Sequence, residues 1–191
     1  SFTGSHQYCG NGLRLASFDG STWTSNVIDS GGNKGCDSAI VIDGNDNAYI
    51  AYQDRSQAKL KFTTNKSGSW IPYTPETGGF NVAYPGYHSS LAMDDQGQFH
   101  IAHYDSLEAN KDLHYSTGVP NGAWTTTVVD SSGDTGRNPS IAIDAAGDPH
   151  IVYRSWSGWK LKYATLNPSS PNWQVSTLSL IHISEPTRQH W

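Results

Sequence analysis

The chain repeats itself about every fifty residues, and this repeat limits what it can fold into. Three segments align without a gap: SAIVIDGNDNAYIAY at 38–52, SSLAMDDQGQFHIAH at 89–103 and PSIAIDAAGDPHIVY at 139–153. A unit this short cannot bury both of its faces alone, so neighbouring units must stack to form a shared core.

Each repeat predicts four antiparallel strands, which we name A to D. Strand A, for example 139–143, is apolar on both faces, as expected for a strand packed between neighbouring sheets. A tight turn that starts at Asp43, Asp94 or Asp144 leads into strand B. Strand C opens with a leucine and strand D, at the outer edge, follows a tryptophan: Leu13, Leu60, Leu113 and Leu161, then Trp23, Trp70, Trp124 and Trp173.

The sequence therefore predicts an all-β fold, a β-propeller of four-stranded antiparallel blades. Strands C and D come first and three full blades follow, about three and a half blades in all. We expect the propeller to span 1–177, with blades at about 13–35, 36–85, 86–135 and 136–177. Closed propellers typically have about four to eight blades. We therefore expect a fragment of a larger propeller, whose open blade edges favour a homo-oligomer.

Residues 178–191 break the repeat pattern. The run LSLIHISEPTR that begins at Leu178 resembles the translation of a sequencing-library adapter, which would make it a non-native tail of a metagenomic sequence. The natural gene is then expected to continue beyond about Thr177, and the tail is excluded from functional reasoning.

Composition and charge narrow the classes of partner. The net charge is −5 and no Lys/Arg cluster is present, which argues against nucleic acid. No apolar run is long enough to predict a membrane span. Abundant Gly, Ser, Thr, Asn and Trp with little Lys favour an extracellular or cell-surface protein. Cys9 and Cys36 could form one disulfide or both stay reduced.

The pattern Ser-Ile-Ala-Ile-Asp-x-x-Gly-x-Pro-His-Ile-x-Tyr, followed by Leu-Lys-Tyr-Ala, resembles the propeller repeats of secreted bacterial proteins in the broad sialidase-like (BNR-type) superfamily. The resemblance covers roughly residues 13–177 and implies carbohydrate recognition. The sialidase Asp-box Ser-x-Asp-x-Gly-x-Thr-Trp is not matched, because the segment 17–23 is one residue short. No arginine triad can be assigned either, so a true sialidase is disfavoured.

The repeats provide an internal control, because a residue type that recurs at one position serves the scaffold. Gly35, Gly86 and Gly136 recur as glycines entering strand A. Calcium at Asp43, Asn45 and Asn47 is not expected, because other repeats use the same place as a plain hairpin. No other cofactor and no metal is predicted, since His100 and His103 of strand B point to opposite faces. The recurrent tryptophans are interpreted as edge packing.

Residues that depart from the repeat are the candidate site. After the glycines stand Asp37, Tyr87, His88, Arg137 and Asn138, and after strand B stand Asp54, Tyr104, Asp105, Arg154 and Trp156. The D–A and B–C loops lie at the same end of a blade, so these side chains are expected to face one funnel. The middle blade also carries His103 where the other blades have tyrosine, and an insert that contains Gly78, Gly79, Phe80 and Tyr84.

Three functions remain open at this point. The first is binding of a polysaccharide or glycan by aromatic rings together with Asp, Asn and Arg. The second is an enzyme. A lyase would use His88 or His103 as base, Tyr87 or Tyr104 as acid, and Arg137 or Arg154 as carboxylate clamp, whereas a glycoside hydrolase would use Asp54 and Asp105. The third is a structural repeat of a surface protein.

Overall fold

The computed structural model describes residues 9–77, 85–107, 111–167, 170 and 172–178, and these residues form an all-β fold. Fourteen strands make one two-stranded and three four-stranded sheets. The described part of the chain contains no helix that is long and apolar enough to cross a membrane.

Every sheet is an antiparallel meander, in which consecutive strands pair. The first pair is β1 (Gly12–Phe18) and β2 (Trp23–Ser30). Blade 1 is β3 (Lys34–Ile42), β4 (Ala48–Asp54), β5 (Lys59–Thr64) and β6 (Ile71–Thr77). Blade 2 is β7 (Tyr87–Met93), β8 (Phe99–Tyr104), β9 (Leu113–Gly118) and β10 (Trp124–Asp130). Blade 3 is β11 (Thr135–Ile143), β12 (Pro149–Ser155), β13 (Lys160–Thr165) and β14 (Gln174–Leu178). The predicted propeller of four-stranded blades is confirmed.

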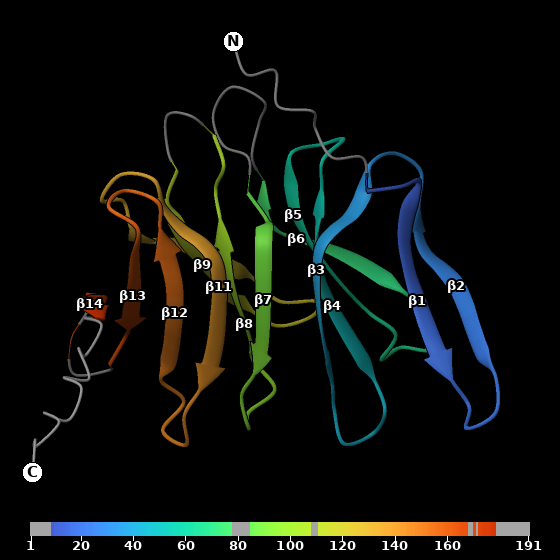
Figure 1. The fold of residues 1–191 in the computed structure, drawn as a ribbon. Coiled ribbons are helices and arrows are strands. Elements are labelled where there is room, and N and C mark those ends of the chain that lie inside the picture. The colour runs from blue at the N-terminus through green and yellow to red at the C-terminus, as the bar shows by residue number, and fades with distance from the viewer. Residues whose placement is uncertain (1–8, 78–84, 108–110, 168–169, 171, 179–191) are drawn as a thin grey trace, which may run out of the picture.

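The sheets stand side by side, as in a partly opened fan (Figure 1). The A strands are neighbours, with β7 packed between β3 and β11. Where the structure describes them, the D–A and B–C connections lie together at one end, uppermost in Figure 1, and the A–B turns lie at the opposite end. This arrangement gathers the loops that depart from the repeat at one end of the molecule.

In blades 1 and 2, strand B is the most deeply buried strand, because it is paired on both edges and covered on both faces. Every residue of β4 and β8 is buried. The prediction that strand A is packed on both faces fits β7, where Leu91 and Ala92 pack towards opposite blades. It is wrong for β3, where Ile40 and Ile42 are 50% and 55% exposed, because no described A strand covers that face.

Two large apolar clusters hold the blades together. One joins blade 1 to blade 2 around Phe62 and Phe99, whose ring centroids lie 4.9 Å apart. The other joins blade 2 to blade 3 around Tyr115, Ile141 and Ile151. The recurrent tryptophans pack as predicted where a blade covers them: Trp124 lies against Phe62, and Trp173 against Tyr115.

Cys9 and Cys36 form a disulfide with a Cα–Cα distance of 5.3 Å. Cys36 is only 2% exposed and lies in β3, at the end of the blade that carries the D–A loops. The bond therefore fastens the segment before β1 to blade 1.

Replacing both cysteines by serine is expected to lower the free energy of unfolding by about 3–4 kcal/mol. The chain-entropy model gives this value for a crosslink between residues separated by 27 positions. Urea unfolding of the oxidised protein and of the double variant measures the difference. Equal midpoints would mean that the bond adds no stability.

Candidate site at the D–A and B–C loops

A β-bulge interrupts strand A at the same place in every blade. The pairing register shifts between Cys36 and Ala39, between Tyr87 and Ser90, and between Arg137 and Ser140. The second residue of each bulge has a positive φ: 49° at Asp37, 51° at His88 and 50° at Asn138. Bulges re-aim side chains and are frequent beside binding and active sites. In each blade, the bulge removes two residues of strand A from the regular alternation of side chains between the two faces of the sheet.

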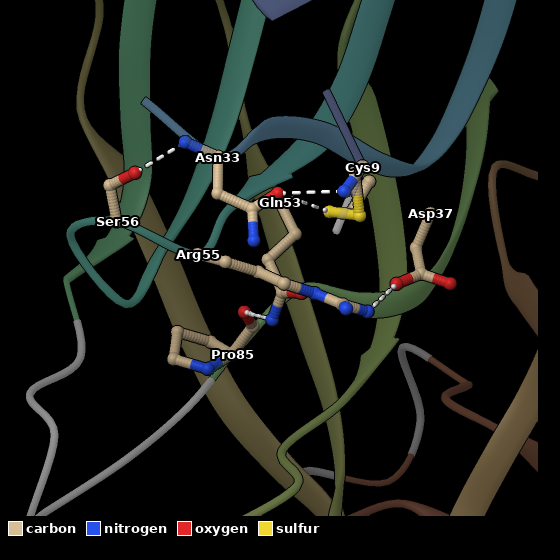
Figure 2. Close-up of a disulfide and its surroundings, with 8 residues drawn as sticks. Cys9, Asn33, Asp37, Gln53, Arg55, Ser56 and Pro85 are labelled. Atoms are coloured by element: carbon tan, nitrogen blue, oxygen red, sulfur yellow. Dashed lines mark hydrogen bonds and ion pairs between the residues drawn. A yellow bond between two sulfur atoms is a disulfide. The ribbon is translucent and has the colours of Figure 1, made fainter. Parts of the chain in front are cut away.

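The D–A and B–C loops are tied to each other by hydrogen bonds that recur between blades. The amide of Asn33 donates to Ser56 Oγ, and the amide of Asp134 donates to Ser157 Oγ at 3.0 Å. Figure 2 shows the first of these bonds, together with the bond from Gln53 Nε2 to the carbonyl of Pro85 (2.8 Å). The loops therefore form one supported platform.

On this platform a row of charged and aromatic groups begins in blade 1. The guanidinium of Arg55 forms an ion pair of 3.1 Å with Asp37 (Figure 2). The same guanidinium lies 4.5 Å from the ring centroid of Tyr87 in blade 2. Arg55 is nearly buried and thus links the first two blades.

His88 occupies the middle of the row. Its ring stacks on Tyr104 with centroids 6.3 Å apart, and the backbone amide of Asn138 donates to its Nδ1 at 3.4 Å. This bond places the proton of the neutral ring on Nε2. Burial lowers the pKa of His88, Asp37 opposes that shift, and the cationic Arg137 and Arg55 reinforce it. His88 is therefore a neutral ring at neutral pH that presents an N–H donor.

Arg137 anchors the next part of the row. It forms a bidentate ion pair with Asp134, Nε–Oδ1 2.8 Å and Nη2–Oδ2 2.9 Å, and lies 4.9 Å from the ring centroid of Tyr104. The hydroxyl of Tyr104 donates to Asp134 Oδ1 at 2.9 Å. Burial and this bond raise the pKa of Tyr104. Burial raises the pKa of Asp134, but the bonds from Arg137 and Tyr104 outweigh it and lower the pKa.

The row ends in blade 3 with two exposed indoles. Trp156 and Trp159 are 43% and 67% exposed, and their ring centroids lie 4.3 Å apart. The guanidinium of Arg154 lies 4.4 Å from one ring centroid and 4.8 Å from the other. The guanidinium of Arg137 also lies over the ring of Trp156, 5.2 Å from its centroid. Cations and aromatic faces thus alternate along this edge.

The structure brings together eight of the eleven residues proposed from sequence: Asp37, Tyr87, His88, Tyr104, Arg137, Asn138, Arg154 and Trp156. It places Asp54, Asp105 and His103 elsewhere, since all three are fully buried. We refer below to the eight residues with Arg55, Asp134 and Trp159 as the platform row.

Asp54 and Asp105 close the B–C turns from inside the blades. Asp54 Oδ1 accepts the amide of Gln57 at 3.1 Å, and Asp105 Oδ1 accepts the amide of Leu107 at 3.1 Å. Asp54 is the last residue of β4, and Asp105 directly follows β8. The alternation of a strand sends both carboxylates inward, because the residue before each of them faces the next blade. Neither carboxylate reaches the platform row.

Arg55, Asp134 and Trp159 were missed by the sequence reasoning. Trp159 stands where blade 1 has Ala58, with a similar positive φ (54° and 51°), so a comparison of the B–C turns could have found it. Asp134 replaces Asn33 in the same manner. The roles of Arg55 and Asp134 depend on contacts between blades, which the pattern of a single repeat does not contain.

Two other features of the sequence lie away from the platform row. Asp43 caps the A–B turn, with Oδ1 accepting the amides of Asn45 and Asn47 at 2.9 Å each, and Asp94 and Asp144 cap their turns alike. A cavity of about 340 Å³ lies at that opposite end, and Tyr49, Met93 and Phe99 are among the residues that line it. The insert with Gly78, Gly79, Phe80 and Tyr84 falls outside the described residues.

The sequence matches no protein-family model, and no curated protein matches it either. Solved structures do match. An exo-β-1,3-galactanase from Phanerochaete chrysosporium is 15% identical with a TM-score of 0.54, and the match covers 86% of this chain and 42% of that one. A mutant of AofleA from Arthrobotrys oligospora is 12% identical with a TM-score of 0.55, covering 85% and 48%.

A thermostable family-43 glycoside hydrolase is 10% identical with a TM-score of 0.50, and the match covers 86% of this chain and 64% of that one. The match thus covers between 42% and 64% of the length of these three structures. At these identities the likeness concerns the fold, which is that of a β-propeller.

Proposed function

We propose that this protein is a carbohydrate-binding β-propeller module that binds a polysaccharide or glycan through the platform row. One observation carries the proposal: the exposed indoles of Trp156 and Trp159 lie beside the guanidinium of Arg154. Exposed aromatic faces can stack on the C–H faces of sugar rings, and guanidinium groups donate hydrogen bonds in a fixed fork. Two proteins of similar fold, an exo-β-1,3-galactanase and a family-43 glycoside hydrolase, support a glycan partner.

Binding fits the described residues better than catalysis. The candidate base His88 carries its proton on Nε2 and its Nδ1 accepts a backbone amide. The candidate acid Tyr104 donates to Asp134, and its pKa is raised. A hydrolase pair of Asp54 and Asp105 would need access to the substrate, yet both carboxylates are buried.

A second candidate function is a protein-docking surface. Gln53 and Tyr104, which occupy the position of Arg154 in the other blades, each reach into the D–A loop of the next blade. Arg154, Trp156 and Trp159 therefore lie where the equivalent residues of the other two blades contact a following blade, and this surface could bind a blade-like partner protein. A solution mass above 20.8 kDa that falls to 20.8 kDa in Trp159→Ala would favour docking over glycan binding.

We also propose an extracellular or cell-surface location. The Cys9–Cys36 disulfide supports it, because such bonds form and persist in oxidising compartments. The acidic net charge is consistent with a partner other than nucleic acid.

Native affinity electrophoresis in gels that contain neutral or uronate-rich polysaccharide tests the proposed function. Retardation in at least one gel is expected, and no new reducing ends or unsaturated products should appear in parallel incubations. The appearance of new products would show that the protein is an enzyme and not only a binding module. Absence of retardation in every gel would contradict a polysaccharide-binding role.

A further inference from the structure

Each interface between neighbouring blades contains a buried polar contact at equivalent repeat positions. A carboxylate stands six residues after the strand-D tryptophan, at Asp29, Glu76 and Asp130. It faces a strand-B residue of the next blade, Tyr52, His103 or Tyr153, and a strand-C residue, Lys61, His114 or Lys162. These positions hold the only triplet of His, Cys, Asp or Glu side chains within the described ranges that is close enough to ligate one metal ion.

The first and third interfaces share the same hydrogen bond, from a tyrosine hydroxyl to an aspartate. Tyr52 donates to Asp29 Oδ2 at 2.6 Å, and Tyr153 donates to Asp130 Oδ2 at 2.7 Å. Lys162 forms an ion pair with Asp130. At the first interface the ion pair with Asp29 (2.8 Å) comes from Lys34 of strand A, and the strand-C residue Lys61 acts on Asp29 electrostatically. A lysine thus places a cation beside each carboxylate.

The middle interface differs at all three positions together. Glu76 Oε2 lies 3.1 Å from His103 Nε2, and Glu76 Oε1 lies 3.1 Å from His114 Nδ1. The repeat gives no scaffold reason for this joint replacement, because tyrosine, lysine and aspartate serve the same contact on either side. A concerted change to two histidines and a glutamate is a departure of the kind that marks a site.

We propose that Glu76, His103 and His114 bind one divalent transition-metal ion, with Zn²⁺ as the best-fitting ion. Two imidazole nitrogens and one carboxylate oxygen form a ligand set that suits Zn²⁺, whereas Ca²⁺ and Mg²⁺ prefer oxygen ligands throughout. The three ligand atoms lie within 4.8 Å of one another. Ligands at ~2.0–2.1 Å from a tetrahedral ion are ~3.4 Å apart, so side-chain shifts of about an ångström suffice.

Burial and charge support a structural ion at this place. His103 is fully buried and His114 is 8% exposed, so the ion would be shielded from bulk water. The groups that act electrostatically on the two rings from outside the pair are acids, namely Glu76, Asp105 and Asp112. A metal ion would supply the positive charge that lysine supplies at the outer interfaces. Ser116 Oγ, 3.2 Å from His103 Nε2, offers a further oxygen ligand.

Metal binding requires both ring nitrogens that donate to Glu76, His114 Nδ1 and His103 Nε2, to give up their protons. The amide of Gly86 donates to His103 Nδ1 at 3.2 Å, so the ring now carries its proton on Nε2. The ion would displace that proton, and the contact with Gly86 would be lost. Gly86 immediately precedes Tyr87 and His88, so the metal would also alter the first residues of the middle bulge.

The test uses tag-free protein freed of metal with a chelator and titrated with Zn²⁺ in a calorimeter. One ion per chain is expected, with a melting temperature raised by about 5 °C or more at 100-fold Kd. The matched control is Glu76→Asp/His103→Tyr/His114→Lys, which installs the contact used by the outer interfaces and keeps every other histidine. It is expected to fold and to bind Zn²⁺ at least about 100-fold more weakly.

Failure of the wild-type protein to bind one Zn²⁺, or equal affinity in the control, would overturn the proposal. Glu76→Gln provides a second variant if the triple variant does not fold, because it removes one ligand and preserves side-chain size. With Co²⁺ as probe, the wild-type protein should show the visible absorption of a tetrahedral centre, and Glu76→Gln should not. Glycan binding is measured in a separate experiment, so a negative result for metal binding does not affect the proposed glycan binding, and the reverse also holds.

Discussion

Joint replacement of Arg154 and Trp159 by alanine is expected to weaken binding of a retarding polysaccharide by about 100-fold. Truncating a tryptophan at the centre of an interface typically costs about 2 kcal/mol or more, and every ~1.4 kcal/mol is a factor of ten in affinity. The guanidinium of Arg154 lies beside both exposed indoles, 4.4 Å from the ring centroid of Trp156 and 4.8 Å from that of Trp159, so removing it also loosens Trp156. Calorimetry with oligosaccharides cut from the polysaccharide gives the two dissociation constants.

Trp23→Ala is the matched control for this prediction. Trp23 is 72% exposed and packs only on Phe18 among the contacts of the described residues, at the far end of the β1–β2 hairpin. Its removal should leave the affinity within about twofold. A comparable loss in Trp23→Ala, or full affinity in the double variant, would refute the assignment of the platform row as the binding surface.

Asp130→Ala should produce the largest loss of stability, about 3–5 kcal/mol, because it leaves the half-buried Lys162 and the buried hydroxyl of Tyr153 without their partner. The carboxylate also accepts bonds from Ser132. Thermal unfolding should show a melting temperature lower by about 10 °C or more. Asp95→Ala, in an exposed turn, is the control and should change it little.

The same contact predicts how stability depends on pH. Burial raises the pKa of Asp130, but the bonds from Lys162, Ser132 and Tyr153 outweigh burial and lower the pKa to about 2, below the usual range of an aspartate. The stabilisation is therefore complete above pH ~4 and is lost as the pH falls towards 2. Asp130→Ala should lack this part of the acid dependence. An unchanged acid profile in the variant would show that Asp130 does not contribute to it.

The fold could be predicted because the same pattern of strands and turns occurs three times in the sequence. The alternation around Asp43, Asp94 and Asp144 defines two strands and a hairpin, and the recurring leucine and tryptophan define the other two. The exposure of Ile40 was not predicted, since a repeat pattern says which face is apolar but not whether another blade covers it.

The site was partly predictable for a related reason. Departures from the repeat located His88, Arg137 and Trp156, because substitution at a scaffold position needs another cause. The same rule misplaced Asp54 and Asp105. A residue next to a loop can turn inward, and only the strand register decides which way it points.

The interface between blades 1 and 2 shows what reading one strand at a time conceals. His100 and His103 do point to opposite faces, as expected from their spacing. The ligand set forms across three strands of two blades, from Glu76, His103 and His114. Comparing these three positions between repeats reveals the joint replacement without any structure.

The NMR signals of the tryptophan indole N–H groups report directly on whether a glycan binds at the platform row. The chain contains seven tryptophans, and a titration of the ¹⁵N-labelled protein with an oligosaccharide of the retarding polysaccharide reports on each of them. If a glycan binds at the platform row, we expect saturable shifts of the Trp156 and Trp159 signals and no shift of the Trp23 signal. Shifts confined to Trp23 or Trp173, or no shift of Trp156 and Trp159 at saturating ligand, would contradict glycan binding at the platform row.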